Sequence, residues 1–175
     1  MQYNGVYFEA IIATPGCGKS YLTDNYPDIF VDMDEERLKC KYEIPSNISR
    51  EELEKTKGDR PYKKRDYNLT TLFSIYDNYY KQGKILLAAP HPECFDYFES
   101  RKIKFCFVYP KKETKKELLK RFNKRKNSSK FINDNINKFD EFYISNKNDK
   151  KADIHYEFDK NEYLEQILRK FGLTF

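Results

Sequence analysis

Five short runs of apolar residues recur along the chain, separated by stretches with helical spacing. The runs predict strands at 6–13, 29–32, 84–89, 103–109 and 152–158. Apolar residues recur every three or four positions between them, which predicts helices at 18–26, 68–81, 92–101, 112–126, 129–145 and 161–172. Because strands that alternate with helices build parallel sheets, the pattern predicts an α/β fold with a five-stranded parallel sheet covered by helices.

Three of the expected helices have an apolar face that should pack on the sheet. We expect these buried positions to be Leu72, Ile75, Tyr76 and Tyr79; Leu118, Leu119 and Phe122; and Ile132, Ile136, Phe139 and Tyr143. Each set faces one side of its helix, so each helix should lie along the sheet rather than stand away from it.

Residues 40–67 interrupt the alternation of strands and helices and are mostly polar. Ser49 and Glu52 have the spacing of a capping box, which predicts a short helix from 50 to 57 before the basic turn "GDRPYKKRD". We interpret this stretch as an insertion within one domain spanning 1–175. It supplies candidate cations for an anionic acceptor, namely Arg60, Lys63, Lys64 and Arg65.

Composition narrows the class of protein. The chain has 175 residues, the size of one compact domain, and its 39% hydrophobic and 17% aromatic content supports a packed core although 35% of the residues are charged. The net charge of +5 is concentrated at 109–130, whereas 28–36 is acidic. This mild, clustered charge favours a small anionic ligand over an anionic polymer. The composition and charge do not indicate an oligomeric state.

Cysteine and histidine spacing argues against a zinc site. The cysteines form no C-x-x-C pair and the two histidines lie far apart; they are Cys17, Cys40, Cys94 and Cys106, with His91 and His155. No apolar run approaches the ~20 residues of a membrane span, and the first residues do not form a signal segment. We therefore expect a cytoplasmic protein without a membrane partner.

The stretch "ATPGCGKSYL" lies between the first expected strand and the first expected helix. A bound triphosphate needs inward-pointing N–H groups, a lysine for the outer phosphates and a hydroxyl for Mg²⁺. The candidate phosphate-binding residues are Thr14, Pro15, Gly16, Cys17, Gly18, Lys19, Ser20 and Tyr21. Ala13 replaces the first glycine of G-x-x-x-x-G-K-[ST], and a chance G-K-S in a lysine-rich chain is the alternative interpretation. We expect Cys17 to fill space in this loop without a redox role.

Asp32 and Asp34 come directly after the second expected strand. In an extended segment, residues two apart face the same way, so both carboxylates should point toward the phosphate loop. A solvated acidic turn that caps the next helix is the alternative. His91, which follows the third expected strand, could contact an acceptor, although a histidine between two prolines can also be purely structural.

A basic helix is expected at about 111–130. Arg121 and Arg125 are four residues apart and so share one face of a helix, with Lys124 beside them. Arginines placed above a phosphate loop would stabilise the charge of a transferring phosphoryl group. A solvated basic surface is the alternative.

These motifs together resemble the P-loop kinases, in particular small nucleoside, nucleotide and metabolite kinases of the adenylate and shikimate kinase type. The likeness covers most of the chain and depends on "ATPGCGKSYL", on "FVDMDEE", which looks like a D-x-D motif, and on "KELLKRFNKRKNS", which looks like a lid helix. It implies a three-layer α/β/α P-loop fold with a helical lid and an acceptor-binding insertion. It also implies ATP and Mg²⁺ as cofactors.

The resemblance implies a role for each candidate residue. Lys19 would reach the outer phosphates, Ser20 and Asp32 would hold Mg²⁺, and Asp32 or Asp34 would act as the base, with Asp34 holding the acceptor. Arg121 and Arg125 would belong to a closing lid. The stretch "LLAAPHPE" lacks a further acidic residue for the metal.

The expected activity is transfer of the γ-phosphate of ATP to a small acceptor, a nucleoside or a nucleoside monophosphate. One alternative is a 5′-hydroxyl polynucleotide kinase, in which the basic insertion and the tyrosines would bind a nucleic-acid end. Another is a regulatory protein that binds ATP without turnover.

Overall fold

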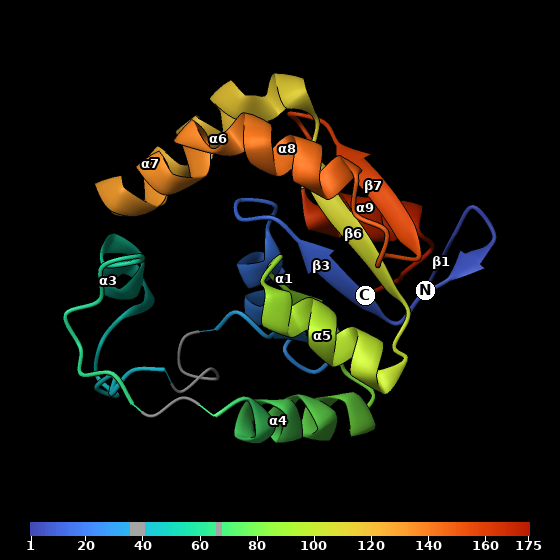
Figure 1. Ribbon diagram of the computed structural model, residues 1–175, viewed down its shortest axis with the longest axis horizontal. Helices are drawn as coiled ribbons and strands as arrows, with labels where there is room; N and C mark the ends of the chain where they lie inside the picture. Colours follow the sequence, from blue (N-terminus) through green and yellow to red (C-terminus); the bar gives the residue numbers. More distant parts are fainter. Residues whose placement is uncertain (36–40, 66–67) are drawn as a thin grey trace.

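One parallel sheet organises the molecule. The computed structural model describes residues 1–35, 41–65 and 68–175, and Figure 1 shows its elements. The sheet has five strands in the order β4–β5–β3–β6–β7, and every neighbouring pair is parallel. The strands are β3 (Ala10–Ala13), β4 (Phe30–Asp32), β5 (Ile85–Ala88), β6 (Phe105–Pro110) and β7 (Ile154–Phe158). The predicted α/β class and five-stranded parallel sheet are confirmed.

Helices cover both faces of the sheet. Along β3 the side chains alternate, so that Ile11 belongs to one buried cluster and Ile12 to the other. The first cluster includes residues of α1 (Lys19–Asn25) and α9 (Leu164–Lys170), and the second includes residues of α4 (Leu69–Lys81) and α5 (Pro92–Arg101). Apolar residues are needed on both faces, which explains the nearly unbroken apolar strands.

The expected face of α4 agrees with the structure in part. On α4, Leu72 and Tyr76 are buried, while Ile75 and Tyr79 pack at the edge of the cluster. The expected capping box is present at α3 (Arg50–Lys55), where the Ser49 side chain accepts from the Glu52 N–H. Glu36, Cys40 and the insertion residues 66–67 lie outside the described residues.

The single helix predicted at 129–145 is wrong. The chain forms α7 (Ser129–Asn137) and α8 (Phe139–Lys147), which meet at Lys138, whose φ of −91° and ψ of 9° end the first helix. Of the expected inward residues only Phe139 is buried, and α7 buries none of its residues fully. The apolar spacing continues through the break, so the pattern alone does not reveal it.

The long strand predicted at 6–13 is also wrong in part. Residues 2–7 form a two-stranded antiparallel hairpin, β1 (Gln2–Tyr3) and β2 (Val6–Tyr7), and only 10–13 join the main sheet. Asn4 and Gly5 have positive φ values of 49° and 81°, which a tight hairpin turn requires. The Asn-Gly pair is the sequence signal for this turn.

The basic segment folds as the short 3₁₀ helix η1 (Lys112–Thr114) followed by α6 (Lys115–Lys124). Leu118 and Phe122 are buried as predicted, but Leu119 is 36% exposed, so its place in the predicted core is wrong. Among the helices of the described ranges, none is both long and apolar enough to cross a membrane.

The order of the strands indicates where a ligand would bind, at the carboxyl ends of β3 and β6. The chain leaves β3 toward β4 on one side, and it leaves β6 toward β7 on the other. Between β3 and β6 the connections therefore diverge at the carboxyl ends of the strands. Crevices of this kind are the usual ligand sites of open parallel sheets. The glycine-rich loop 13–20 lies there.

Candidate functional site

The glycine-rich loop joins β3 to α1, as predicted. Gly16 and Gly18 have φ values of +85° and +108°, a conformation that side-chain-bearing residues rarely adopt. A Cβ at Gly16 would lie 3.0 Å from Phe122 Cε1 and 3.1 Å from Leu118 Cδ2. The glycine is therefore required both by the backbone angle and by the close packing of α6.

Neighbouring elements bind the carbonyl groups of this loop. Lys19 Nζ donates to Ala13 O at 2.6 Å, Arg121 Nη1 to Gly16 O at 3.2 Å, and Leu164 N to Cys17 O at 2.8 Å. Within the described part of the chain, the N–H groups of residues 16–18 have no backbone acceptor. The loop thus fixes its acceptors and leaves donors for an anion.

Asp32 ends β4 beside Lys19. It is buried, and its Oδ1 accepts the Asp34 N–H at 2.9 Å. Burial raises the pKa of the Asp32 carboxyl above its ordinary value, while the charge of Lys19 opposes this rise. Lys19, itself 6% exposed, has the largest effect of the positive charges that act on this carboxyl. The expected proximity of this carboxylate to the phosphate loop is therefore present.

Asp34 lies two residues further along and faces a different set of groups. His91 Nε2 is 3.4 Å from Asp34 Oδ1, and Lys57 Nζ is 4.0 Å from Asp34 Oδ2. The carboxylate is 13% exposed and the imidazole 48% exposed. Three segments far apart in the sequence thus meet here: the end of β4, the insertion, and the start of α5. His91 thus contacts the second carboxylate of the acidic pair.

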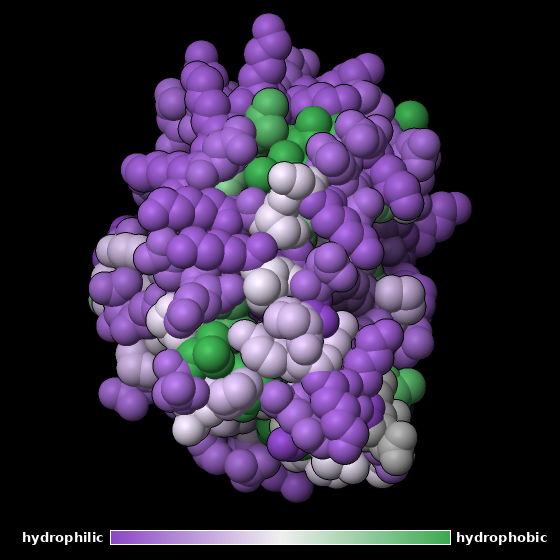
Figure 2. All heavy atoms as spheres, turned by 90° about the vertical axis from the view of Figure 1, so that its left-hand side faces the viewer, coloured by the Kyte–Doolittle hydropathy of each residue, from purple (hydrophilic) through white to green (hydrophobic). Residues whose placement is uncertain are grey.

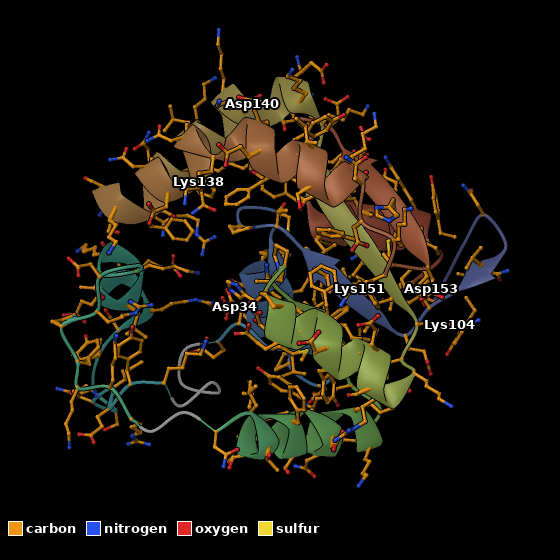
Figure 3. All side chains as sticks on the ribbon, viewed as in Figure 1. Asp34, Lys104, Lys138, Asp140, Lys151 and Asp153 are labelled. Carbon is orange, nitrogen blue, oxygen red and sulfur yellow. The ribbon has the colours of Figure 1, made fainter. Side chains whose placement is uncertain are left out.

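A cleft of about 910 Å³ opens beside these residues. We call it the α5–α8 cleft because side chains of those helices line it, with Thr14, Pro15 and Asp34 at the loop end. Figure 3 shows side chains of α5, α7 and α8 pointing into the space between these helices, with Asp34 and Lys151 labelled on different sides of it. Thr14 Oγ1 is buried at the loop end and has no hydrogen-bond partner among the described residues.

A second pocket, of about 680 Å³, borders the loop at Gly16 and Gly18. We call it the α6–α9 pocket. Its lining includes Gly18, Ser20 and Tyr21 from the loop and α1, and Arg121, Lys124, Arg125 and Tyr163 from the flanking elements. The expected loop residues are thus divided between two spaces, with Thr14 facing one and Ser20 the other.

Arg121 binds the backbone of two segments. Besides Gly16 O, it donates to Lys160 O at 2.7 Å and to Glu162 O at 3.2 Å, and its guanidinium stacks 4.0 Å from the centroid of Tyr163. It is 6% exposed. These contacts place its charge on main-chain carbonyls, whereas the expected lid arginine would point at phosphate oxygens. Arg121 therefore binds the loop and the 160–163 segment, and it also lines the α6–α9 pocket.

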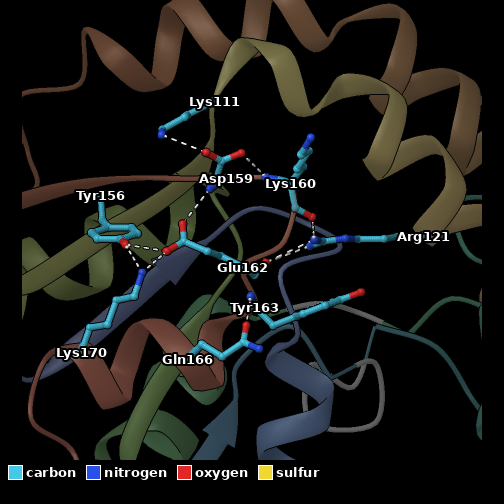
Figure 4. A network of polar contacts seen from close by, with 9 residues as sticks. All are labelled: Lys111, Arg121, Tyr156, Asp159, Lys160, Glu162, Tyr163, Gln166 and Lys170. Carbon is cyan, nitrogen blue, oxygen red and sulfur yellow. Dashed lines mark hydrogen bonds and ion pairs between the residues drawn. The ribbon is translucent and has the colours of Figure 1, made fainter.

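A polar network holds the segment to which Arg121 binds (Figure 4). Glu162 accepts hydrogen bonds from the Asp159 N–H at 2.7 Å and from the Tyr156 hydroxyl at 3.0 Å, and it pairs with Lys170. Burial opposes ionisation of Glu162, but these donors lower its pKa. The segment 159–163 is therefore fixed against β7 and α9, and Tyr163 is held at the pocket.

Arg125 occupies a more open position. It lies 3.2 Å from Glu54 of α3 and is 34% exposed. Asn127 also donates to Glu54, and Lys126 pairs with Glu51 at 3.0 Å. Burial opposes ionisation of Glu54, but Lys57 and Arg125 lower its pKa. Acidic residues of the insertion thus hold the end of α6 and neutralise the arginine that faces the pocket.

The basic turn of the insertion only partly reaches a cavity. Arg60 lines the α5–α8 cleft, where it donates to Leu53 O and to Thr56 Oγ1, the latter at 2.8 Å. Lys63 pairs with Glu43 at 3.3 Å and is 78% exposed. Lys64 and Arg65 are exposed and do not line either cavity. The expected four-residue cation cluster is therefore not assembled at the site.

The described cysteines and acidic residues near the loop bear on a metal site. Cys17 is 1% exposed, and burial raises the pKa of its thiol. Within the described ranges no three His, Cys, Asp or Glu side chains are grouped to hold a metal ion. Mg²⁺ normally takes only one or two protein oxygens together with phosphates and water. The Ser20 hydroxyl, which lines the α6–α9 pocket, and the Asp32 carboxylate, which feels the charge of Lys19, are oxygen donors of the kind this smaller requirement needs.

Comparison with known proteins adds no family. A scan against protein-family models gives no match, and a search of curated proteins finds no similar sequence.

Two site residues have only weak sequence signals. Tyr163 lies in a polar stretch before α9, and its place at the pocket follows from stacking on Arg121, which is 42 positions earlier in the sequence. Thr14 belongs to the loop, but its unpartnered hydroxyl is visible only in three dimensions. No spacing rule would have paired these residues with their surroundings.

Proposed function

We propose that the protein is a P-loop phosphotransferase that moves the γ-phosphate of ATP, with Mg²⁺, to the hydroxyl of a small acceptor. The observation that carries this proposal is the loop 13–20. The carbonyls of Ala13, Gly16 and Cys17 are bonded, the N–H groups at 16–18 have no backbone acceptor among the described residues, and Lys19 is folded back along the loop. That arrangement suits a chain of phosphates.

The two cavities suggest how the substrates divide. The α6–α9 pocket contacts Gly18, Ser20 and Tyr21, so it would receive the nucleotide, with Tyr163 and Arg121 as its flat wall. The α5–α8 cleft contacts Thr14 and Asp34, so it would receive the acceptor. The transferred phosphoryl group would then pass over the loop between the two.

Each chain residue has a defined task in this reaction. Asp34 accepts the proton of the acceptor hydroxyl while that oxygen attacks the γ-phosphorus, and the bond from phosphorus to the β-phosphate bridging oxygen breaks to release ADP. Lys19 leaves Ala13 O to contact the outer phosphates. Ser20 and Asp32 would hold Mg²⁺, which supplies positive charge to the phosphates. Arg125 moves from Glu54 to the transferring oxygens.

Arg121 has a different task from the one its spacing implied. Its hydrogen bonds to Gly16 O and to the carbonyls of residues 160 and 162 hold the loop in one position against the wall of the pocket. In this proposal it keeps the loop in a phosphate-binding shape and does not touch the reacting atoms.

The proposal is tested with ATP carrying labelled γ-phosphate. The screen offers nucleosides, nucleoside monophosphates, 5′-hydroxyl oligonucleotides and shikimate-like metabolites as acceptors. We expect label on one acceptor class, strongly reduced transfer by Lys19→Ala and Asp34→Asn, and ATP binding retained in Asp34→Asn. ATP binding without transfer to any acceptor would instead indicate a nucleotide-binding regulatory protein.

A further inference from the structure

We propose that a network of alternating charges couples the two cavities, so that an acceptor bound at Asp34 releases Arg125 to the phosphates of ATP. This inference rests on the proposed phosphotransferase function and adds the regulation of its site. The charge network consists of two carboxylates and two cations that alternate in sign, namely Asp34, Lys57, Glu54 and Arg125. Three observations carry the inference: each cavity holds one ion pair, the two pairs are linked, and the backbone around them is held in place.

Each cavity contains one ion pair of the charge network. Asp34 and Lys57 both line the α5–α8 cleft, where Lys57 Nζ lies 4.0 Å from Asp34 Oδ2. Glu54 and Arg125 both line the α6–α9 pocket, where Arg125 Nη2 lies 3.2 Å from Glu54 Oε1. One turn of the insertion therefore supplies a member of both pairs, a cation to the cleft and a carboxylate to the pocket.

Glu54 and Lys57 link the two pairs. They are three residues apart at the end of α3, where the Lys57 N–H donates to Glu54 O at 3.2 Å. Residues at this spacing on a helical turn are neighbours. Burial raises the pKa of the Glu54 carboxyl, but the charges of Lys57 and then of Arg125 lower it by more. The same carboxylate thus interacts with one cation from each cavity.

The network is shielded from water over most of its length. The two carboxylates, Asp34 and Glu54, are 13% and 15% exposed, and Lys57 between them is 21% exposed. Charges that are partly removed from water interact more strongly than charges on an open surface, and salt screens them less. A change of partner at one end of the network should therefore alter the interactions at the other end.

The backbone that carries the network is held against α6 and α7. Ser128 Oγ donates to Lys57 O, Asn127 Nδ2 donates to Glu54, and Lys57 Nζ lies 5.2 Å from the ring centroid of Phe131. Figure 2 shows the side of the molecule where α3 and α7 lie, and most of the residues on it are hydrophilic. Because these contacts hold the main chain in place, we expect the coupling to work by exchange of side-chain partners.

The exchange follows from the alternation of sign. An acceptor hydroxyl that takes Asp34 as its hydrogen-bond partner weakens the hold of this carboxylate on Lys57. Lys57 then turns to Glu54, which in turn holds Arg125 less firmly, and the guanidinium moves to the phosphates. In the reverse direction, phosphates that attract Arg125 leave Glu54 to Lys57 and so free Asp34 for the acceptor. Linkage requires the two effects on binding to be equal in size.

The experiment measures the coupling without an acceptor. Asp34→Asn imitates the occupied cleft, because an amide does not form an ion pair with Lys57. The probe is an ATP analogue with an imido bridge between the β- and γ-phosphates, titrated with Mg²⁺ into the full chain in a calorimeter. We expect the Kd of Asp34→Asn to fall about fivefold, a typical size for coupling between two sites.

Two backgrounds and one matched control show whether the network transmits the effect. In Arg125→Met and in Lys57→Met the network is interrupted, so adding Asp34→Asn should leave the Kd unchanged. Asp134→Asn is the control, because Asp134 lines the same cleft from α7, is exposed, and loses the same charge. It should leave the Kd of the unmodified chain unchanged. If one background variant fails to fold, the other carries the test.

The outcomes distinguish this inference from the proposed function. An unchanged or raised Kd in Asp34→Asn would overturn the coupling. A fall that persists in either background, or that Asp134→Asn reproduces, would show that removal of a negative charge acts on ATP directly, and it would overturn the coupling as well. In both cases the phosphotransferase proposal stands. Absence of binding of the analogue to the unmodified chain and to every variant would refute the phosphotransferase, and the coupling with it.

Discussion

Two arginines one helical turn apart on α6 should respond very differently to the same substitution. Arg121 is 6% exposed and binds main-chain carbonyls, with Glu117 3.7 Å from its Nε, whereas Arg125 is 34% exposed and pairs with Glu54. Replacing each by Met removes the charge and retains most of the chain length. Arg121→Met should lower stability, and Arg125→Met should lower phosphoryl transfer.

The size of the Arg121 effect follows from its contacts. The substitution leaves carbonyls of residues 16, 160 and 162 without their shared donor and removes stacking on Tyr163 at 4.0 Å. Unpaired buried acceptors cost about 1–3 kcal/mol each, but some of these carbonyls regain water when the guanidinium is absent. We expect a loss of about 3 kcal/mol in the free energy of unfolding. For a chain of this length that is roughly 9 °C in Tm.

Arg125→Met should cost far less stability. Its ion pair with Glu54 spans 3.2 Å but is partly solvated, and such pairs contribute about 1 kcal/mol or less. If Arg125 contacts the transferring phosphoryl group, its loss should lower kcat by about a hundredfold.

The assay is urea denaturation followed by circular dichroism, with linear extrapolation, together with the kinetics of labelled phosphate transfer. Equal losses of stability for the two variants would refute the assignment of Arg121 to the loop backbone. Full activity of Arg125→Met would refute its role at the phosphate.

Three further substitutions test the loop, the buried carboxylate and the insertion. Gly16→Ala should lower the free energy of unfolding by about 3 kcal/mol, because the φ of +85° and the two close α6 side chains both oppose a Cβ. Gly83→Ala is the control, since it has a φ of +77° but open space around it, and it should cost about 1 kcal/mol. Equal losses of unfolding free energy in the two variants would contradict this reasoning. Because burial raises the pKa of Asp32, the native state holds more protons than the unfolded state between the ordinary and the raised pKa, so stability should fall as pH rises through that window. Asp32→Asn should remove that fall while losing Mg²⁺-dependent transfer, and an unchanged pH profile of unfolding would argue against it. Glu54→Gln should release Arg125 from its partly exposed ion pair and so lower the Kd for ATP about fivefold, as measured by titration calorimetry. Weaker ATP binding would count against a movement of Arg125 from Glu54 to the phosphates.

Local patterns determined most of the elements of this protein. The apolar runs predicted the strands of the sheet, the Ser49–Glu52 capping box predicted α3, and the glycines of 13–20 predicted a loop between strand and helix. Each of these features depends only on residues a few positions apart, so the sequence alone is enough to predict it. The Asn4-Gly5 turn belongs to the same class and could have been recognised.

Tertiary structure decided which side chains meet. The break at Lys138 leaves the apolar spacing of 129–145 intact, so only packing reveals two helices. Arg121 and Arg125 share a helix face, yet only one of them reaches the carbonyls of the loop and of residues 160–162. Periodicity gives the direction of a side chain relative to its own helix. Its partners come from other parts of the chain, and the folded sheet alone brings them together.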